Sequence, residues 1–343
     1  MVALNWLLKA PTPQDMRWLG VEDASAVAAC RSAAQAMAGR LQFPAACADQ
    51  MALAVTEAAS NLHKHARQGS LLLLVNRDAE TPGMDLVTVD SGPGLPDVRA
   101  AMRDGHSTAG TLGIGLGAIR RLADFCDLYS RPGHGTALVA RFRPASGQPA
   151  PGQPAIRCAG LVRPITGEVE CGDVYGAIRT GDTMTAVLCD GLGHGPLAAA
   201  AAAVGVTAVL DQPAGEPAAL LEQVHRRMRG TRGGAVGIVQ VRGQLARFAG
   251  LGNVAASILS EGSRQSMLSM PGIAGYQARA IRQFEYPVPP GAAVILHSDG
   301  ISSRWEAAAL PGVNARDPLL IAAVLLAEAG IHRDDAGVLV LGS

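Results

Sequence analysis

The sequence has few aromatic residues, few charged residues and no net charge. Aromatic residues make up 3% of its 343 positions and charged residues 17%, with 29 basic and 29 acidic side chains. Because neither half of the chain has a basic excess, we do not expect nucleic acid as a partner. The hydrophobic fraction of 48% is large enough to build packed cores, which excludes a largely disordered chain.

No stretch of the sequence is typical of a membrane span or of a signal peptide, and there is no paired cysteine motif. The longest apolar stretch, 196–210, is mostly alanine and too short to cross a bilayer. The first 15 residues have neither a basic start nor a small-residue cleavage site. The 6 cysteines form no C-x-x-C pair and several lie in apolar runs, which is typical of small buried residues. We therefore expect a cytoplasmic protein with reduced thiols and no membrane partner.

A segment rich in proline and glycine divides the chain. Residues 144–155, PASGQPAPGQPA, contain no large apolar side chain and are typical of a flexible linker. They separate a domain over 1–143 from a domain over 156–343, each long enough for its own core. We expect an α/β (α+β) protein.

Each half has its own pattern of helices and strands. In the first half, the pattern predicts helices over 23–39, 48–66 and 118–126 and strands over 71–76, 85–90 and 137–142. This order favours a two-layer α/β sandwich. In the second half, it predicts strands over 185–190, 235–241, 293–299 and 337–342 and helices over 197–210, 217–229 and 318–329. Buried strands with a few helices favour a layered α/β/β/α arrangement.

Two polar residues share one face of the helix predicted over 48–66. Glu57 and Asn61 lie one turn apart, away from the apolar stripe of that helix. An asparagine carbonyl is a hard oxygen ligand suited to Mg²⁺, and a nearby glutamate can orient or deprotonate an attacking hydroxyl. An ordinary polar face of a helix would contain the same pair, so this segment alone does not identify a binding site.

A second candidate segment follows the strand predicted over 85–90. Asp90 ends that strand, and Gly92 and Gly94 come directly after it. A carboxylate at a strand end can accept a hydrogen bond from an adenine amino group, and glycine lets the backbone approach a ring closely. Taken alone, the same residues also fit a simple Pro-Gly turn.

A third segment places three glycines before a predicted helix. Backbone amides at Gly113, Gly115 and Gly117 could bind phosphate at a helix start, and Thr136 could offer its hydroxyl to the phosphates. A dinucleotide site of the Rossmann type is disfavoured. The glycines do not lie in a first βα turn, and no acidic residue ends a following strand at the required distance.

In this order, the three segments resemble the N, G1 and G2 boxes of the GHKL ATP-binding fold. Over residues 15–143 the chain resembles the RsbT-like switch kinases. The resemblance implies ATP with Mg²⁺ and phosphorylation of Ser or Thr on a STAS-domain protein. It also implies that Asn61 holds Mg²⁺, Glu57 acts as the base, Asp90 binds adenine and the three glycines form the ATP lid. A sensor histidine kinase is disfavoured, because no phosphoacceptor histidine motif precedes the domain.

Four acidic positions recur in the second half. Asp190 and Asp299 are each expected to end an apolar strand, Asp173 opens a stretch of sheet, and Asp334 precedes the last strand. Carboxylates from distant segments can meet at one sheet edge, where such hard ligands suit two Mg²⁺ or Mn²⁺ ions. Two ions of this kind can activate a shared water for attack on phosphorus.

The order of these residues resembles the PPM-type metal-dependent Ser/Thr phosphatases of the SpoIIE-like branch. Residues 156–342 are similar to the RsbX-like phosphatases, which implies a four-layer αββα sandwich. The resemblance makes Asp190 the bridging metal ligand, with a backbone carbonyl from Gly191. Asp299 and Asp334 would complete the site, and Asp173 would bind directly or through water.

Three further positions in this half affect the expected site. Asp335 is an alternative metal ligand to Asp334, which we favour. Gly337 stands where family members often carry threonine. His194 could meet the substrate phosphate, although a loop histidine satisfied by a neighbour is the expected reading.

The two resemblances together predict a bifunctional regulator of bacterial partner switching. It would phosphorylate and dephosphorylate STAS-domain proteins, with a downstream phosphatase or sigma-regulatory partner also conceivable. The alternative is a phosphatase whose N-terminal domain is a non-catalytic module that binds ATP or a partner. An anti-sigma kinase of the RsbW type and a degraded phosphatase kept for binding are weaker alternatives.

Overall fold

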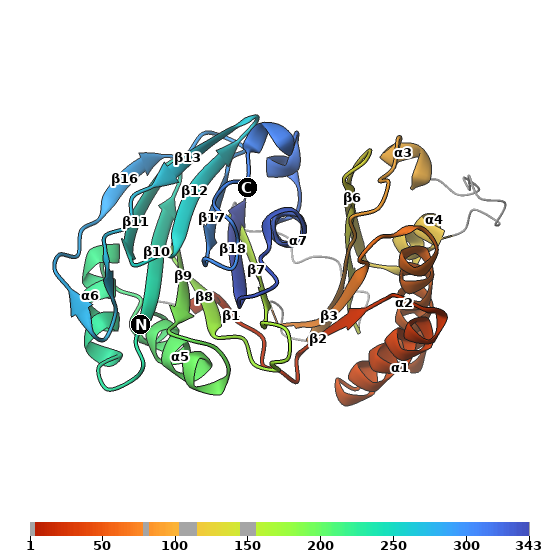
Figure 1. The fold of residues 1–343 in the computed structure, drawn as a ribbon, viewed down its shortest axis with the longest axis horizontal. Helices are drawn as coiled ribbons and strands as arrows, with labels where there is room; N and C mark the ends of the chain where they lie inside the picture. Colours follow the sequence, from red (N-terminus) through yellow and green to blue (C-terminus); the bar gives the residue numbers. More distant parts are fainter. Residues whose placement is uncertain (1–3, 78–81, 103–114, 145–155, 343) are drawn as a thin grey trace. The chain divides into compact units, whose positions relative to one another are not determined.

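The computed structural model describes residues 4–77, 82–102, 115–144 and 156–342. The chain forms two compact units, which are coloured along the sequence in Figure 1. The smaller unit is Pro11–Gln153, and the larger unit combines Met1–Ala10 with Pro154–Ser343. No helix in these described ranges is both long and apolar enough to span a membrane.

The first strand of the chain belongs to the larger unit. Strand β1 (Leu4–Lys9) pairs antiparallel with β8 (Asp173–Thr180), with Leu7 opposite Ile178. The expected domain over 1–143 is therefore wrong at its start. The smaller unit is inserted between β1 and the rest of the larger unit, because pairing with a distant strand satisfies the backbone groups of β1.

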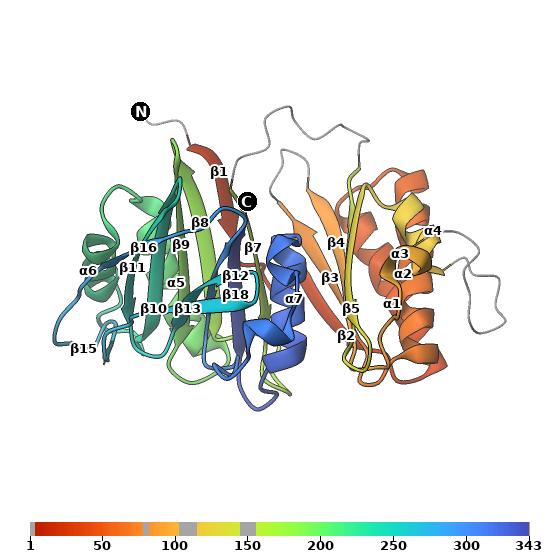
Figure 2. The same cartoon turned by 90° about the horizontal axis from the view of Figure 1, so that it is seen from above.

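The smaller unit is one antiparallel sheet covered by helices on one face, which confirms the expected two-layer sandwich. The strand order is β2-β3-β4-β6-β5. The strands are β2 (Met16–Gly20), β3 (Ser70–Asn76), β4 (Gly83–Val89), β5 (Phe125–Arg131) and β6 (Gly135–Phe142). The helices are α1 (Ala24–Arg40), α2 (Ala45–His65), α3 (Val98–Ala101) and α4 (Gly115–Leu122). Figure 2 shows α1, α2 and α4 on the same side of the sheet.

Local sequence explains most of these helix boundaries. The Asp23 carboxylate accepts a hydrogen bond from the Ala26 amide at 3.0 Å and caps the start of α1. Helix α2 buries its apolar stripe and leaves Glu57 and Asn61 half-buried on another face. The helix predicted over 118–126 is too long. It ends at Leu122, because the residues from Phe125 onward pair with β6.

The larger unit contains two stacked antiparallel sheets with helices on both outer faces, which confirms the expected αββα sandwich. The first sheet has the order β1-β8-β9-β10-β11-β16, and the second has β13-β12-β17-β18-β7. Helices α5 (Pro196–Asp211) and α6 (Pro217–Arg227) pack on the first sheet, and α7 (Pro318–Ala329) packs on the second.

The remaining strands of this unit have the following bounds. The first sheet contains β9 (Thr183–Gly191), β10 (Gly234–Arg242), β11 (Leu245–Leu251) and β16 (Phe284–Pro287). The second contains β7 (Arg157–Arg163), β12 (Ala255–Ser260), β13 (Ser263–Met267), β17 (Ala293–His297) and β18 (Ala336–Gly342). A short pair, β14 (Gly272–Ile273) with β15 (Gln277–Ala278), and the 3₁₀ turns η1 (Ala307–Ala309) and η2 (Val313–Ala315) complete the unit.

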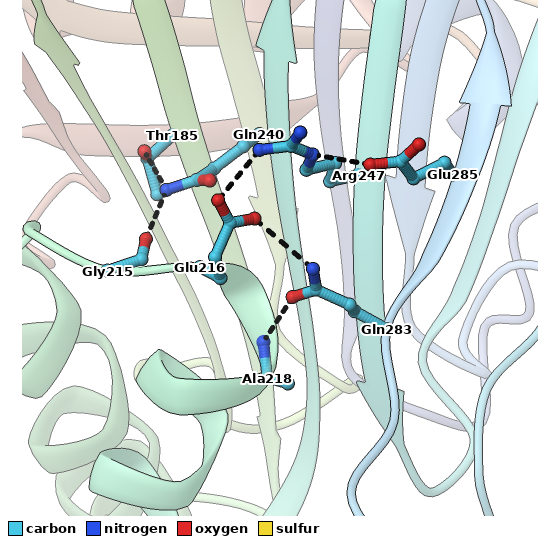
Figure 3. Close-up of polar contacts among 8 residues, drawn as sticks. All are labelled: Thr185, Gly215, Glu216, Ala218, Gln240, Arg247, Gln283 and Glu285. Carbon is cyan, nitrogen blue, oxygen red and sulfur yellow. Dashed lines mark hydrogen bonds and ion pairs between the residues drawn. The ribbon is translucent and has the colours of Figure 1, made fainter.

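A polar network fixes the start of α6 on the first sheet (Figure 3). The Arg247 guanidinium of β11 donates to Glu216 at 2.7 Å and to Glu285 at 2.8 Å. Gln283 joins Glu216 to the Ala218 amide at the first turn of the helix. Each exposed contact contributes little alone, but together they hold α6 against β11 and β16.

Candidate functional site

The smaller unit brings the first and third predicted nucleotide-binding segments into contact. The side-chain amide of Asn61 on α2 lies against Gly115, the first residue of α4. A Cβ atom on Gly115 would lie 3.0 Å from Asn61 Nδ2 and 3.1 Å from Oδ1. Glu57 lies one turn earlier on α2, Gly117 is buried inside α4, and Gly113 falls outside the described residues.

The second segment forms a tight corner around Asp90. The Asp90 carboxylate accepts a hydrogen bond from the Gly92 amide at 2.7 Å, and burial raises the pKa of this carboxyl. A Cβ atom on Gly92 would lie 2.8 Å from that carboxylate oxygen, so the corner requires glycine. Gly94 has φ +67° and packs closely against the carbonyl of Arg131, which again favours glycine.

The structure places Thr136 beside Asp90. The Asp90 amide donates to the Thr136 carbonyl at 3.0 Å, next to the β4–β6 pairing. The Thr136 hydroxyl lies 2.9 Å from the hydroxyl of Ser130 on β5. Thr136 therefore belongs to the same corner as the carboxylate that was predicted to bind adenine.

In the larger unit, Asp173 and Asp190 face each other across the β8–β9 pair. Asp173 is only 2% exposed. Its Oδ2 accepts a hydrogen bond from Ser298 Oγ at 2.6 Å, and its Oδ1 has no hydrogen-bond partner among the described residues. Burial and then the neighbouring Asp190 raise the pKa of Asp173 well above its usual range.

The other acidic residues lie close enough to affect the same pair. Burial first, then Asp299 and Asp334, raise the pKa of Asp190 to about 7. Burial and Asp299 also raise the pKa of Asp334. The four predicted positions thus meet at one end of the two sheets, and their negative charges repel one another.

This cluster has the donor chemistry of a divalent-cation site. In the ranges that the structure describes, no group of three or more His, Cys, Asp or Glu side chains has the arrangement of a metal site. The unpartnered, buried oxygen of Asp173 and the raised pKa of Asp190 both indicate uncompensated negative charge. Hard oxygen donors of this kind fit Mg²⁺ or Mn²⁺.

The two adjacent acidic residues before β18 differ in their surroundings. Asp335 is 4% exposed, and its two carboxylate oxygens accept hydrogen bonds from the Ile165 amide at 2.7 Å and the Gly172 amide at 2.9 Å. Asp334 is half-buried and, among the residues that the structure describes, accepts a hydrogen bond from the Asp335 amide alone, at 2.9 Å. Asp335 therefore joins two loops, whereas Asp334 has fewer hydrogen bonds within the described residues.

Two residues that support the cluster were not predicted from the sequence. Ser298 Oγ donates to Asp173 and accepts the Gly337 amide at 2.9 Å. Asn253, in the β11–β12 loop, donates its side-chain amide to Asp299. Asp299 does not end a strand as expected: β17 stops at His297, and Asp299 lies in the following turn. The only sequence signals were a serine before Asp-Gly and a Gly-Asn pair after a strand.

Position 337, which holds glycine and not threonine, packs closely against Asp173. A Cβ atom on Gly337 would lie 3.1 Å from both Cβ and Oδ2 of Asp173 and 3.1 Å from a methyl of Leu188. A larger residue there would press on the carboxylate. In this chain, a hydroxyl that contacts Asp173 comes from Ser298.

The loop after Asp190 is compact and carries His194. A Cβ atom on Gly191 would lie 2.2 Å from the Ala198 carbonyl, so this position requires glycine. His194 Nδ1 lies 2.9 Å from a carboxylate oxygen of Glu168. The histidine is therefore held by a neighbouring side chain, as expected for a satisfied loop histidine.

A separate hollow of about 800 Å³ lies near the opposite ends of these strands. Its walls include Arg179, Asp182 and Arg242. Asp182 precedes β9 while Asp190 lies near the end of that strand, which separates them by about 26 Å of extended chain. The hollow is therefore not part of the carboxylate cluster.

Comparison with known proteins assigns both units. Residues 21–142 match the family model of the histidine kinase-like ATPase domain, and residues 180–341 match that of stage II sporulation protein E, SpoIIE. The chain is 34% identical over 114 residues to the serine/threonine-protein kinase RsbT of Bacillus subtilis, which covers 33% of this chain and 86% of that protein. The chain belongs to the RsbT family. In it, an RsbT-like ATPase domain is joined to a SpoIIE phosphatase domain.

Similar solved structures cover the larger part of the chain. A chain from work on the bacterial stressosome, described as a modular system adapted to control secondary messenger signalling, is 27% identical with a TM-score of 0.49. It covers 54% of this chain and 98% of its own length. RsbX in complex with magnesium is 19% identical with a TM-score of 0.48, and covers 55% of this chain and 94% of its own length.

Proposed function

We propose that this protein is a partner-switching regulator with two opposed activities on STAS-domain proteins. The larger unit removes phosphate from Ser or Thr with the help of divalent metal ions, and the smaller unit adds it from ATP. The observation that carries the proposal is the meeting of Asp173, Asp190, Asp299 and Asp334 at one end of the two sheets. The RsbT-like and SpoIIE matches support the same pair of chemistries.

In the phosphatase site, Asp190, Asp299, Asp334 and the Gly191 carbonyl would hold two Mn²⁺ or Mg²⁺ ions. Asp173 would bind directly or through water. When bound, such ions supply positive charge and an activated water for attack on phosphorus. The protein supplies orientation: Ser298 fixes one oxygen of Asp173, leaving its other oxygen without a partner among the described residues.

In the kinase site, Asn61 would hold the Mg²⁺ that accompanies ATP. Glu57, one turn away, would accept the proton of the attacking hydroxyl. The adenine end would lie at the Asp90 corner, where Gly92 and Gly94 keep the backbone close and Thr136 adds a hydroxyl. The amides at Gly115 and Gly117 would meet the phosphates. The contact between Asn61 and Gly115 supports this arrangement, because it joins the metal-holding and phosphate-binding segments.

The phosphatase activity is tested with the full chain and a phosphorylated STAS-domain protein in saturating Mn²⁺. We expect release of phosphate that stops with a chelator and falls by several orders of magnitude in Asp190→Asn, since one of the carboxylates that would hold the metal ions is lost. Asn61→Ala serves as the matched control and should release phosphate at the wild-type rate. Equal turnover in Asp190→Asn and wild type would refute the assignment.

The kinase activity is tested with unphosphorylated STAS-domain protein and labelled ATP. The assay uses the Asp190→Asn variant, so that phosphatase activity does not remove the phosphate that the kinase transfers. Label should appear on the substrate with this variant, and should be absent when the Asn61→Ala substitution is combined with it. ADP binding without any transfer of label would instead favour the alternative, in which the smaller unit is a non-catalytic regulatory module.

A further inference from the structure

An exposed arginine lies beside the loop that follows Asp190. Arg232 is in the turn between α6 and β10, and its guanidinium covers Gly193: a Cβ atom on Gly193 would lie 3.0 Å from Arg232 Nη1. The Gly193 carbonyl in turn lies 3.3 Å from the Cβ position of Gly172, whose amide binds Asp335. Arg232 also lies two residues before Gly234, which pairs with Gly191 next to Asp190, so its turn adjoins the strand end that carries Asp190.

The backbone that carries Arg232 is firmly held. The Thr231 hydroxyl donates to the Met228 carbonyl at 2.7 Å and accepts the Gly233 amide at 3.0 Å. The Gly233 carbonyl accepts the Leu192 amide at 3.1 Å, which joins this turn to the loop after Asp190. The backbone turn that carries Arg232 is therefore held against the loop after Asp190.

Arg232 has no anionic partner within the described ranges of the chain. Some arginines of the larger unit, Arg247 and Arg157 among them, are paired with carboxylates. His194, in the loop after Asp190, lies 2.9 Å from a carboxylate oxygen of Glu168. An exposed guanidinium that binds no carboxylate, beside the loop that follows Asp190, is suited to bind an anion that approaches this loop.

We propose that Arg232 binds the phosphoryl oxygens of the phosphorylated substrate at the mouth of the larger unit's site. This inference rests on the proposed phosphatase function and adds a substrate-recognition residue to it. A guanidinium can form two parallel, charge-assisted hydrogen bonds with a phosphoryl group. Arg232 would thus hold the phosphoryl group of the substrate at the mouth of the site, and it would act in binding rather than in the bond-breaking step.

The test compares Arg232→Met with a matched control, Arg229→Met, in the full chain. Arg229 is also exposed and lies in the same turn, so both variants lose one positive charge from the same segment. Inorganic phosphate is the binding probe, measured by calorimetry in saturating Mn²⁺. KM and kcat are measured with a phosphorylated STAS-domain protein, and Mn²⁺ binding is titrated separately.

We expect Arg232→Met to weaken phosphate binding and raise KM by about 10- to 100-fold, as for loss of a charge-assisted hydrogen bond, with kcat changed less than threefold. Arg229→Met should stay within twofold of wild type, and both variants should bind Mn²⁺ normally. Arg232→Lys should recover part of the affinity, because it keeps the charge without the planar fork.

Three outcomes would overturn the inference: unchanged phosphate affinity in Arg232→Met, an equal effect of Arg229→Met, or altered Mn²⁺ binding. If the wild-type protein binds phosphate through Arg232 but does not act on phosphorylated STAS-domain proteins, the recognition site stands and the proposed substrate is wrong. Phosphate calorimetry therefore separates the two failures.

Discussion

The hydroxyl of Ser298 should be one of the most important single polar groups for the stability of the larger unit. It is fully buried, donates to Asp173 at 2.6 Å and accepts the Gly337 amide at 2.9 Å. Ser298→Ala removes both bonds and leaves two buried groups unsatisfied. At about 1–3 kcal/mol for each unsatisfied buried group, partly relieved by relaxation, we expect a loss of about 2–4 kcal/mol.

A second buried serine provides the matched control. Ser257, on β12 of the same sheet, is 4% exposed, and its hydroxyl has no hydrogen-bond partner among the residues described. Ser257→Ala removes a similar atom but breaks no bond. We therefore expect it to be neutral or slightly stabilising, because burying an unpartnered hydroxyl is unfavourable.

The assay is urea unfolding of the full chain, followed by hydrogen exchange of peptides from β8, β17 and β18. Hydrogen exchange in these peptides reports the stability of the larger unit separately from that of the smaller one. With a urea dependence of about 2 kcal/mol/M, Ser298→Ala should lower the unfolding midpoint by about 1–2 M. Equal midpoints for the two variants would refute the reasoning, since it depends on the bonded serine differing from the unbonded one.

Three further predictions concern the other parts of the molecule. Deleting residues 1–10 should lower the melting temperature of the larger unit and leave hydrogen exchange in the smaller unit unchanged, because β1 pairs with β8. In the metal-free protein, the raised pKa of Asp190, about 7 against 3.8, means that the folded state holds a proton that the unfolded state has released. Stability should therefore fall as pH rises from about 4 to 7, and thermal melts of Asp190→Asn should show a flatter decline. Gly115→Ala should weaken ATP binding roughly tenfold in calorimetry by displacing the Asn61 amide, whereas Gly39→Ala, which meets no atom within 4 Å, should not.

Patterns that depend on neighbouring residues could be read from the sequence. The apolar stripe of α2, with Glu57 and Asn61 on another face, follows from the helical period alone. The buried strands β9, β10 and β18 are apolar runs of the expected length. The order of the acidic residues and glycines was enough to indicate both families, because each motif lies within a short segment.

Features that depend on distant partners were decided only by the tertiary structure. The sequence of β1 carries no sign that its partner is β8, more than 160 residues away, so the boundary at residue 1 could not be predicted. The same limit applies to the different surroundings of Asp334 and Asp335. These two residues are chemically identical neighbours in the chain, and they differ because the backbone amides of Ile165 and Gly172 occupy one carboxylate and not the other. A hydrogen bond across more than 160 residues leaves no local pattern, because only the packing of the two sheets brings donor and acceptor together.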